Sequence, residues 1–511
     1  MKSNIKRYIL TIFGAILLVL AYPKFNLPFL AWFAFIPFFM AIKDQDSLKR
    51  LIHGFIFGFV FFYGTLYWIN NSVIIYGGVK WYASIFIVAL LNAYLAIYMS
   101  LFAFLLPVLR KRLFNSIIIT APVLFVALEH LRGWFLTGFG FSSLGYSQVD
   151  YHSLIQIADI TGHYGISFIV ILVNAAIFTL LIEKKTKKEK IRITTLTCSI
   201  LIIFNLYGFI KLHGKKDAPK LKSAVIQPDI PQEIKNEATG KRGIWEDCLD
   251  LTIQAINDSP EIVIWPESAT GTIYNDSYIL HSELETLTRI LECDIILGSV
   301  YRDNNDRIYN TAFHISENGK VKDQYDKIHL LPFGEYMPLA KAFFFISRMV
   351  PAISDFSPGV DYKVFTLNEH KISKNHVKFS VIICYESLFP NMVRKFVKKG
   401  ATFIINISND AWFGKTAGPY QHFNVNIFRA IENRTPIIRS ANTGVSGFID
   451  KYGRVTKITP TFIKAQISET LQLRNDTTFY TRFGDIFAYI CIFIVVYGII
   501  SIKFESGGKT R

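Results

Sequence analysis

The sequence predicts a polytopic α-helical membrane protein of about eight spans that also carries an α/β domain outside the membrane. Two observations indicate the membrane part. The mean hydropathy of the 511 residues is +0.31, and apolar segments of about 20 residues, long enough to cross a bilayer, recur before residue 215 and near the C-terminus. A third observation is that strand-like and helical runs alternate between them, which is typical of α/β layering. We therefore expect a membrane domain with seven spans at 1–215, an extracytoplasmic domain at 216–478, and a C-terminal span with a cytoplasmic tail at 479–511.

The apolar spans can be placed in order along the chain. They cover about 8–22, 27–42, 51–70, 83–108, 114–134, 163–182 and 193–212, with an eighth at about 483–502. The first span follows a basic start, as a signal peptide does, but it has a poor small-x-small cleavage pattern. We expect it to be retained as a span.

Lysine and arginine gather in every second connection between these spans, and the intervening loops carry little positive charge. The clusters are Lys2, Lys6 and Arg7; Lys43, Lys49 and Arg50; Arg110, Lys111 and Arg112; Lys184, Lys185, Lys187, Lys188, Lys190 and Arg192; and Lys503, Lys509 and Arg511. Positive loops stay in the cytoplasm, so both termini are predicted there and residues 216–478 outside. Because these loops hold much of the net charge of +16, no nucleic-acid partner is expected.

Ionisable residues also stand at the end of the fifth span, namely Glu129, His130 and Arg132. Such residues at membrane depth are candidates for function. A helix-end pair that only anchors the interface is an equally good interpretation, and the sequence leaves both open.

The extracytoplasmic region begins with a short polar linker at 216–220 and then alternates strands with helices. The expected strands are Ser223–Gln227, Glu261–Trp265, Asp294–Val300, Thr311–Ser316, Lys378–Cys384, Thr402–Ile407 and Pro436–Arg439. The expected helices are Arg242–Asn257, Glu283–Leu291 and Asn391–Lys398.

The run V-I-I-C-Y-E-S-L-F-P from Val381 to Pro390 is the strongest candidate for a catalytic turn. A buried strand ends in Cys384 just before a helix start, which would present a nucleophile at a sheet edge. A lone cysteine in an apolar run is more often a buried structural residue. Its interpretation therefore depends on the polar residues elsewhere in the chain.

Two further stretches supply such residues. E-I-V-I-W-P-E-S places Glu267 just past a strand, and Y-D-K-I-H-L-L-P-F-G-E-Y-M-P places Lys327, His329 and Glu335 among turn formers. A buried carboxylate can take the thiol proton of Cys384, and a lysine with a backbone N–H of the cysteine turn can stabilise an oxyanion. Each residue alone is a weak signal, but the set is complete for acyl transfer through a thioester.

In this order the motifs W-P-E-S, Y-D-K-x-H-L-x-P-F-G-E-Y-x-P and C-Y-E resemble the Glu-Lys-Cys signature of the nitrilase superfamily. Together with the spans, the whole chain resembles the bacterial apolipoprotein N-acyltransferase family. Further matches are I-P-Q at 230–232, Y-N-T at 309–311, S-N-D-A-W-F-G at 408–414, G-P-x-Q-H at 418–422 and R-S-A-N-T-G at 439–444.

The resemblance implies roles for individual residues. Glu267 would be the general base, Lys327 the oxyanion stabiliser and Cys384 the acylated nucleophile. The supporting or substrate-binding positions would be Glu335, Tyr385, Glu386, Phe141, Asn310 and Trp412.

The resemblance also implies a fold, a reaction and a location. The fold would be an αββα sandwich joined to the membrane helices. A phospholipid, typically phosphatidylethanolamine, would give its acyl chain to Cys384, and the chain would then pass to the α-amine of an N-terminal diacylglyceryl-cysteine of a lipoprotein. The enzyme would be a monomer of the bacterial inner membrane with its catalytic domain on the periplasmic side.

The chain departs from the family pattern at two aromatic positions. Asn236 stands where the family often has a tryptophan, and Phe141 stands where another tryptophan is frequent. An outer compartment would allow a Cys248–Cys293 disulfide, although sequence does not determine pairing. No histidine spacing or glycine-rich loop indicates a metal or nucleotide, so no cofactor is expected.

Two other functions are alternatives to acyl transfer. A membrane-tethered nitrilase-type amidase acting on a small substrate would share the triad but would not need seven preceding spans. A transporter with a vestigial outer domain would need repeats that the spans do not show. A further expectation is that Phe343 to Met349 enters the bilayer interface beside the site, with a buried core helix as the alternative.

Overall fold

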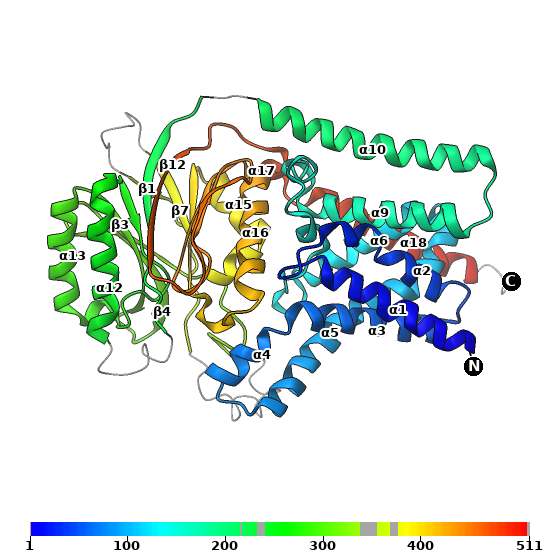
Figure 1. Cartoon of the computed structure of the whole chain (residues 1–511), viewed down its shortest axis with the longest axis horizontal. Helices are drawn as coiled ribbons and strands as arrows, with labels where there is room; N and C mark the ends of the chain where they lie inside the picture. Colours follow the sequence, from blue (N-terminus) through cyan, green and yellow to red (C-terminus); the bar gives the residue numbers. More distant parts are fainter. Residues whose placement is uncertain (1, 215–216, 232–240, 338–354, 368–376, 508–511) are drawn as a thin grey trace. The chain divides into compact units, whose positions relative to one another are not determined.

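The computed structural model describes residues 2–214, 217–231, 241–337, 355–367 and 377–507. The chain separates into two compact units, drawn together in Figure 1. The first contains Met1–Asn70, Tyr82–Gly214 and Phe483–Arg511, and the second contains Asn71–Trp81 and Lys215–Arg482. The short segment Asn71–Trp81 therefore belongs with the second unit, although it lies between helices of the first in the sequence.

The first unit is helical, with a helix at each position where an apolar span was expected. These helices are α1 (Lys2–Leu20), α2 (Phe35–Ile42), α3 (Ser47–Leu66), α5 (Trp81–Leu113), α6 (Ile117–Arg132), α9 (His163–Ile182), α10 (Lys187–His213) and α18 (Ile486–Gly507). Among the described residues, three helices are long and apolar enough to cross a membrane, or four if α3 and the helical segment Ile69–Ile75, which is bent by 61° from it, form one span. A membrane protein is thus supported, whereas the count of eight spans is not confirmed, because helices such as α2 and α6 are short.

Local signals set several helix starts in this unit. The side chain of Asp46 accepts a hydrogen bond from Lys49 N (2.9 Å) and caps α3. Thr186 and Glu189 form a capping box at the start of α10. Capping satisfies N–H groups that have no partner within a helix, so these helices begin close to where polar residues interrupt the apolar runs.

The second unit contains two six-stranded sheets. The first has the order β12 (Ala465–Gln472), β1 (Lys220–Gln227), β2 (Ile262–Ile264), β3 (Asp294–Arg302), β4 (Ile308–Ile315) and β5 (Val321–Asp326). The second has the order β11 (Val455–Ile458), β10 (Gly447–Ile449), β9 (Ile437–Ala441), β8 (Phe403–Ser408), β7 (Lys378–Ile383) and β6 (Phe365–Thr366). Strands β1, β2 and β3 run parallel to one another, as do β7, β8 and β9.

Helices cover the outer face of each sheet (Figure 1). Helices α12 (Lys241–Gln254) and α13 (Tyr278–Leu291) pack on the first sheet, and α15 (Pro390–Lys398) and α16 (Gly418–Asn433) lie on the second. The sheets face each other, since Ser440 Oγ of β9 donates to Ile226 O of β1 at 2.9 Å. This is the αββα layering that the resemblance implied.

The expected strands and helices of this domain are present, with ends shifted by a few residues. Helix α16 and strands β5, β6 and β10 to β12 were not anticipated. Cys248 and Cys293 are both free and buried, so the disulfide considered above is not formed. The segment 343–349 and Asn236 lie outside the described residues.

Candidate active site

Cys384 lies where β7 ends and the short helix η7 (Cys384–Leu388) begins. Its backbone φ is +51°, a left-handed conformation that costs a non-glycine residue on the order of 1 kcal/mol. The strand cannot continue through such a residue, so the chain turns sharply there. As the sequence predicted, Cys384 comes directly after a buried strand, and its own side chain is buried as well.

Glu386 ties this turn to the segment that follows Lys327. Its Oε2 accepts from Ile383 N (2.7 Å), and its Oε1 accepts from Tyr325 Oη (2.8 Å), Ile328 N (2.8 Å) and His329 N (3.1 Å). Burial raises the pKa of Glu386 to about 7, although backbone donors and Lys327 oppose the shift. Glu386 therefore joins the turn that carries Cys384 to the segment that follows Lys327.

Lys327, which follows β5, lies between two carboxylates. Its Nζ is 2.8 Å from Glu335 Oε2 and 3.5 Å from Glu267 Oε1. Burial alone would lower the pKa of Lys327, but Glu335 and Glu267 outweigh it and raise that pKa. The ammonium thus stays charged although its side chain is only 2% exposed.

Asn310 on β4 joins the same carboxylates from another side. Its Nδ2 donates to Glu267 Oε1 (2.7 Å) and to Glu335 Oε1 (2.8 Å). Glu335 Oε2 also accepts from Leu331 N at 2.7 Å. Donors from Asn310 and Lys327 therefore hold two like-charged groups close together, which would repel each other otherwise.

Glu267 follows β2, and its carboxylate is fixed from both sides. Oε2 accepts from Asn409 N at 2.8 Å, at the end of β8. The neighbouring strand β3 has glycine at 298, where a Cβ would lie 2.6 Å from Glu267 Cα. Only glycine allows β3 to approach the backbone of Glu267 this closely, so Gly298 sets the backbone position of Glu267.

The thiol of Cys384 is held in its protonated form. Burial raises the pKa of Cys384, the Glu267 charge raises it further, and the Lys327 charge lowers it. The thiolate is the nucleophilic form of cysteine. Attack by this thiol therefore needs a base, and Glu267 is a buried carboxylate whose charge acts on the thiol.

A second buried cluster also adjoins the thiol. Ligand atoms of Cys384, Asp410 and His422 lie within 4.8 Å of one another, a set that could suggest a metal. However, Arg439 Nη2 lies 2.8 Å from Asp410 Oδ2, and this guanidinium disfavours a cation. Burial opposes ionisation of Asp410, yet Arg439 and His422 hold the pKa of that carboxyl well below its usual range. The motifs around 408–414 and 418–422 signalled these residues, but sequence reasoning gave them no role.

The remaining predicted residues lie at different distances from this chemistry. Tyr385 is buried beside Phe389, with ring centroids 5.2 Å apart. Trp412, in helix η8 (Asp410–Phe413), accepts from Ser72 Oγ (2.7 Å) through its backbone carbonyl. Phe141 lies in the helical unit and packs on Trp68, with centroids 5.1 Å apart. The structure therefore brings the triad, Glu335, Asn310 and Glu386 together, while Phe141 belongs to the other unit.

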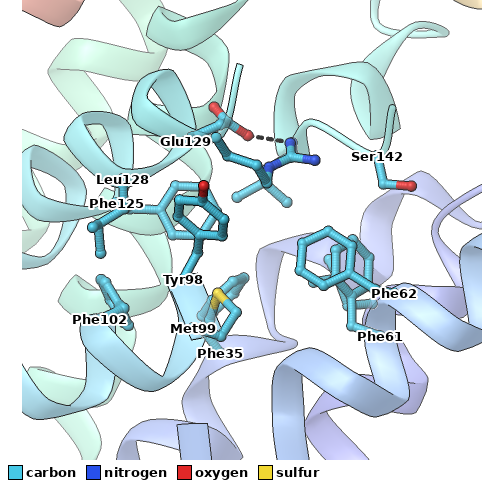
Figure 2. A pocket seen from close by; sticks show the side chains of 13 residues that line it. Phe35, Phe61, Phe62, Tyr98, Met99, Phe102, Phe125, Leu128, Glu129 and Ser142 are labelled. Atoms are coloured by element: carbon cyan, nitrogen blue, oxygen red, sulfur yellow. Dashed lines mark hydrogen bonds between the residues drawn. The ribbon is translucent and has the colours of Figure 1, made fainter. Parts of the chain in front are cut away.

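The charged residues at the end of α6 organise a loop and border a cavity. Arg132 donates to Phe141 O (2.6 Å), and Glu129 Oε1 accepts from Leu144 N (2.7 Å). Both side chains are buried, so they are not surface anchors. The adjoining cavity of about 30 Å³ is large enough for water. Figure 2 shows six aromatic side chains around it: Phe35, Phe61, Phe62, Tyr98, Phe102 and Phe125.

Two solved structures are similar to about half of the chain. Saccharomyces cerevisiae Nit3, described as a member of branch 10 of the nitrilase superfamily, is 21% identical with a TM-score of 0.38 and covers 51% of this chain and 93% of its own. An amidase from Nesterenkonia sp. AN1, with the acetamide moiety of fluoroacetamide on its active-site cysteine, is 17% identical with a TM-score of 0.38 and covers 50% and 92%.

Sequence families and relatives account for nearly the entire chain. Residues 14–176 match the apolipoprotein N-acyltransferase N-terminal domain, and residues 222–475 match the carbon-nitrogen hydrolase family. Apolipoprotein N-acyltransferase of Geobacter metallireducens is 35% identical over 95% of this chain and 93% of its own. The enzyme of Rickettsia bellii is 32% identical over 93% of each chain. The chain belongs to the apolipoprotein N-acyltransferase family.

Proposed function

We propose that the chain transfers an acyl group from a phospholipid to the α-amine of a lipoprotein's N-terminal diacylglyceryl-cysteine, through a thioester on Cys384. The observation that carries the residue roles is the buried group of charges in which Lys327 Nζ lies 3.5 Å from Glu267 Oε1 and 2.8 Å from Glu335 Oε2. The charges of Glu267 and Lys327 both act on the buried thiol of Cys384. We propose phosphatidylethanolamine as the donor and a monomer as the working form.

The first half-reaction acylates the cysteine. The sulfur attacks the ester carbonyl carbon of the phospholipid while Glu267 takes the thiol proton. Lys327, together with the backbone N–H of Tyr385, stabilises the oxyanion. The ester C–O bond then breaks, and the glycerol oxygen takes the proton from Glu267, so that a lysophospholipid leaves.

The second half-reaction uses the same groups on the lipoprotein. The neutral α-amine attacks the thioester carbonyl, a C–N bond forms and the C–S bond breaks. One amine proton passes through Glu267 to the departing sulfur, which restores the thiol. A covalent intermediate suits this reaction because two bulky lipid-bearing substrates must use one site in turn.

The membrane arrangement forms part of the proposal. Eight spans, two cytoplasmic termini, and a catalytic region on the periplasmic side of the inner membrane fit the alternation of basic loops. Reporter fusions at Lys188 and Glu317 should report opposite sides. If both report the same side, the span count is wrong.

The reaction itself is tested with the purified full chain and phosphatidylethanolamine vesicles. Mass spectrometry should detect an acyl adduct on Cys384, and Cys384→Ala should abolish it. The acylated enzyme is then mixed with a diacylglyceryl-cysteine peptide, and the acyl chain should appear as an amide on that peptide. Release as free fatty acid without an amide would favour the amidase alternative.

A further inference from the structure

His422 of α16 contacts the carbonyl of the nucleophile, and no catalytic step above uses it. Its side chain is buried, and its Nε2 lies 3.1 Å from Cys384 O. A carbonyl oxygen can only accept a hydrogen bond. This contact therefore requires a proton on Nε2 of His422.

Arg439 and Asp410 contact the other ring nitrogen. Nδ1 of His422 lies 3.1 Å from Arg439 Nη2 and 2.9 Å from Asp410 Oδ1. The guanidinium can only donate to Nδ1 and the carboxylate can only accept from it, so these two contacts favour opposite states of that nitrogen. Burial and the Arg439 charge lower the pKa of His422, against the opposing effect of Asp410. The contact with Cys384 O needs a proton on Nε2 only, and both the neutral Nε2–H tautomer and the charged ring supply it.

The Cys384 carbonyl and the Tyr385 N–H belong to one planar peptide group. In a trans peptide they point in opposite directions. A donor that fixes the direction of the carbonyl oxygen therefore also fixes the direction of the N–H, which points away from that donor. A hydrogen bond to the carbonyl also polarises the group and makes its N–H a stronger donor. The left-handed conformation of Cys384 makes such support valuable, because it is not the backbone's preferred state.

We infer that His422 is a positioning residue that aims the Tyr385 N–H at the developing oxyanion opposite Lys327. This inference rests on the proposed thioester chemistry at Cys384. It extends that chemistry to a polar network of His422, Asp410 and Arg439 that never touches substrate.

A pair of matched variants isolates the contact. In His422→Gln the amide nitrogen can reach the position of Nε2 and donate to Cys384 O. In His422→Asn the shorter amide can occupy the position of Nδ1 but cannot reach that carbonyl. Two probes of the full-length enzyme are compared: the rate at which p-nitrophenyl butyrate acylates Cys384, which forms an oxyanion, and alkylation of Cys384 by iodoacetamide, which forms none.

For His422→Asn, acylation should fall by about 10- to 100-fold, because an oxyanion donor is misaimed rather than removed. For His422→Gln it should stay within about threefold of the parent enzyme. Alkylation of both variants, followed from pH 7 to 10, should keep the parent profile, since Glu267, Lys327, Asp410 and Arg439 are unchanged around the thiol.

His314→Asn is the control for loss of a buried histidine. His314 pairs with Asp294 at 2.7 Å, at the end of β3 remote from Glu267, and its replacement should lower thermal stability without changing the ratio of acylation to alkylation. Equal loss of both reactions in His422→Asn, or no rescue by His422→Gln, would overturn the inference. Failure of the parent enzyme to take acyl chains from phosphatidylethanolamine would instead refute the proposed function, because the ester probe tests the oxyanion donor separately.

Discussion

Replacing Glu267 with glutamine removes its charge and its ability to accept a proton, and two reactions of the Cys384 thiol report on these two losses separately. The side chain keeps nearly the same shape, but it cannot accept the thiol proton. One of its two oxygens, which now accept from Asn310 Nδ2 and Asn409 N, becomes an N–H donor. A buried donor left facing another donor costs about 1–3 kcal/mol of folding free energy, so the variant should fold with reduced stability.

The substitution Glu267→Gln should slow acylation of the Cys384 thiol without slowing its alkylation. Acylation of Cys384 by phospholipid should fall by about 10²- to 10⁴-fold, the usual contribution of a general base. Alkylation by iodoacetamide at fixed pH should be unchanged or faster, because the Glu267 charge raises the pKa of Cys384 and its removal lowers that pKa. Both rates can be followed by mass spectrometry of the intact protein.

Glu335→Gln is the matched control, since it removes an equal charge from the same lysine. Glu335 holds Lys327 from the other side, and this variant should slow acylation while the base, and with it the pH dependence of acylation, is retained. If Glu267→Gln slows alkylation as much as acylation, Glu267 is structural. If it leaves acylation intact, another group is the base.

The remaining predictions concern the lysine, the thiol and the glycine beside the base. Lys327→Met should lower acylation by about 10²- to 10³-fold through loss of an oxyanion donor, with alkylation also slower because the lysine lowers the thiol pKa. In the parent enzyme, alkylation of Cys384 should rise about tenfold per pH unit from pH 7 to 9 without a plateau, because burial raises the pKa of this thiol; a plateau near neutral pH would mean a preformed thiolate. Gly298→Ala would place a Cβ 2.7 Å from Pro266 O, and such overpacking costs about 1–3 kcal/mol. Its melting temperature and acylation rate should fall together, and full activity would show that the backbone of Glu267 is not held by this contact.

Local sequence signals predicted the two strands that carry the site. The strand ending at Cys384 and the strand before Glu267 were visible as apolar runs closed by polar residues, because hydrophobic patterning and turn formers act over a few positions. Helix α16 was missed because it carries buried polar residues such as His422 and Asn426 on faces that would normally be apolar. The predicted count of eight spans is not confirmed by the helix lengths of the described residues, because apolar composition does not reveal where a helix ends.

The sequence by itself determined the order of the candidate catalytic residues, the apolar segments and the family. It could not determine which polar groups share hydrogen bonds, because those pairs join strand ends that are far apart in the chain. Asn409 N, just after β8, meets Glu267, just after β2, across 142 positions. Only the packing of two sheets brings such ends together. The tertiary structure therefore decided that Asn310 bridges two carboxylates. It also decided that Glu386 joins the Cys384 turn to the segment after Lys327, and that His422 contacts the carbonyl of Cys384.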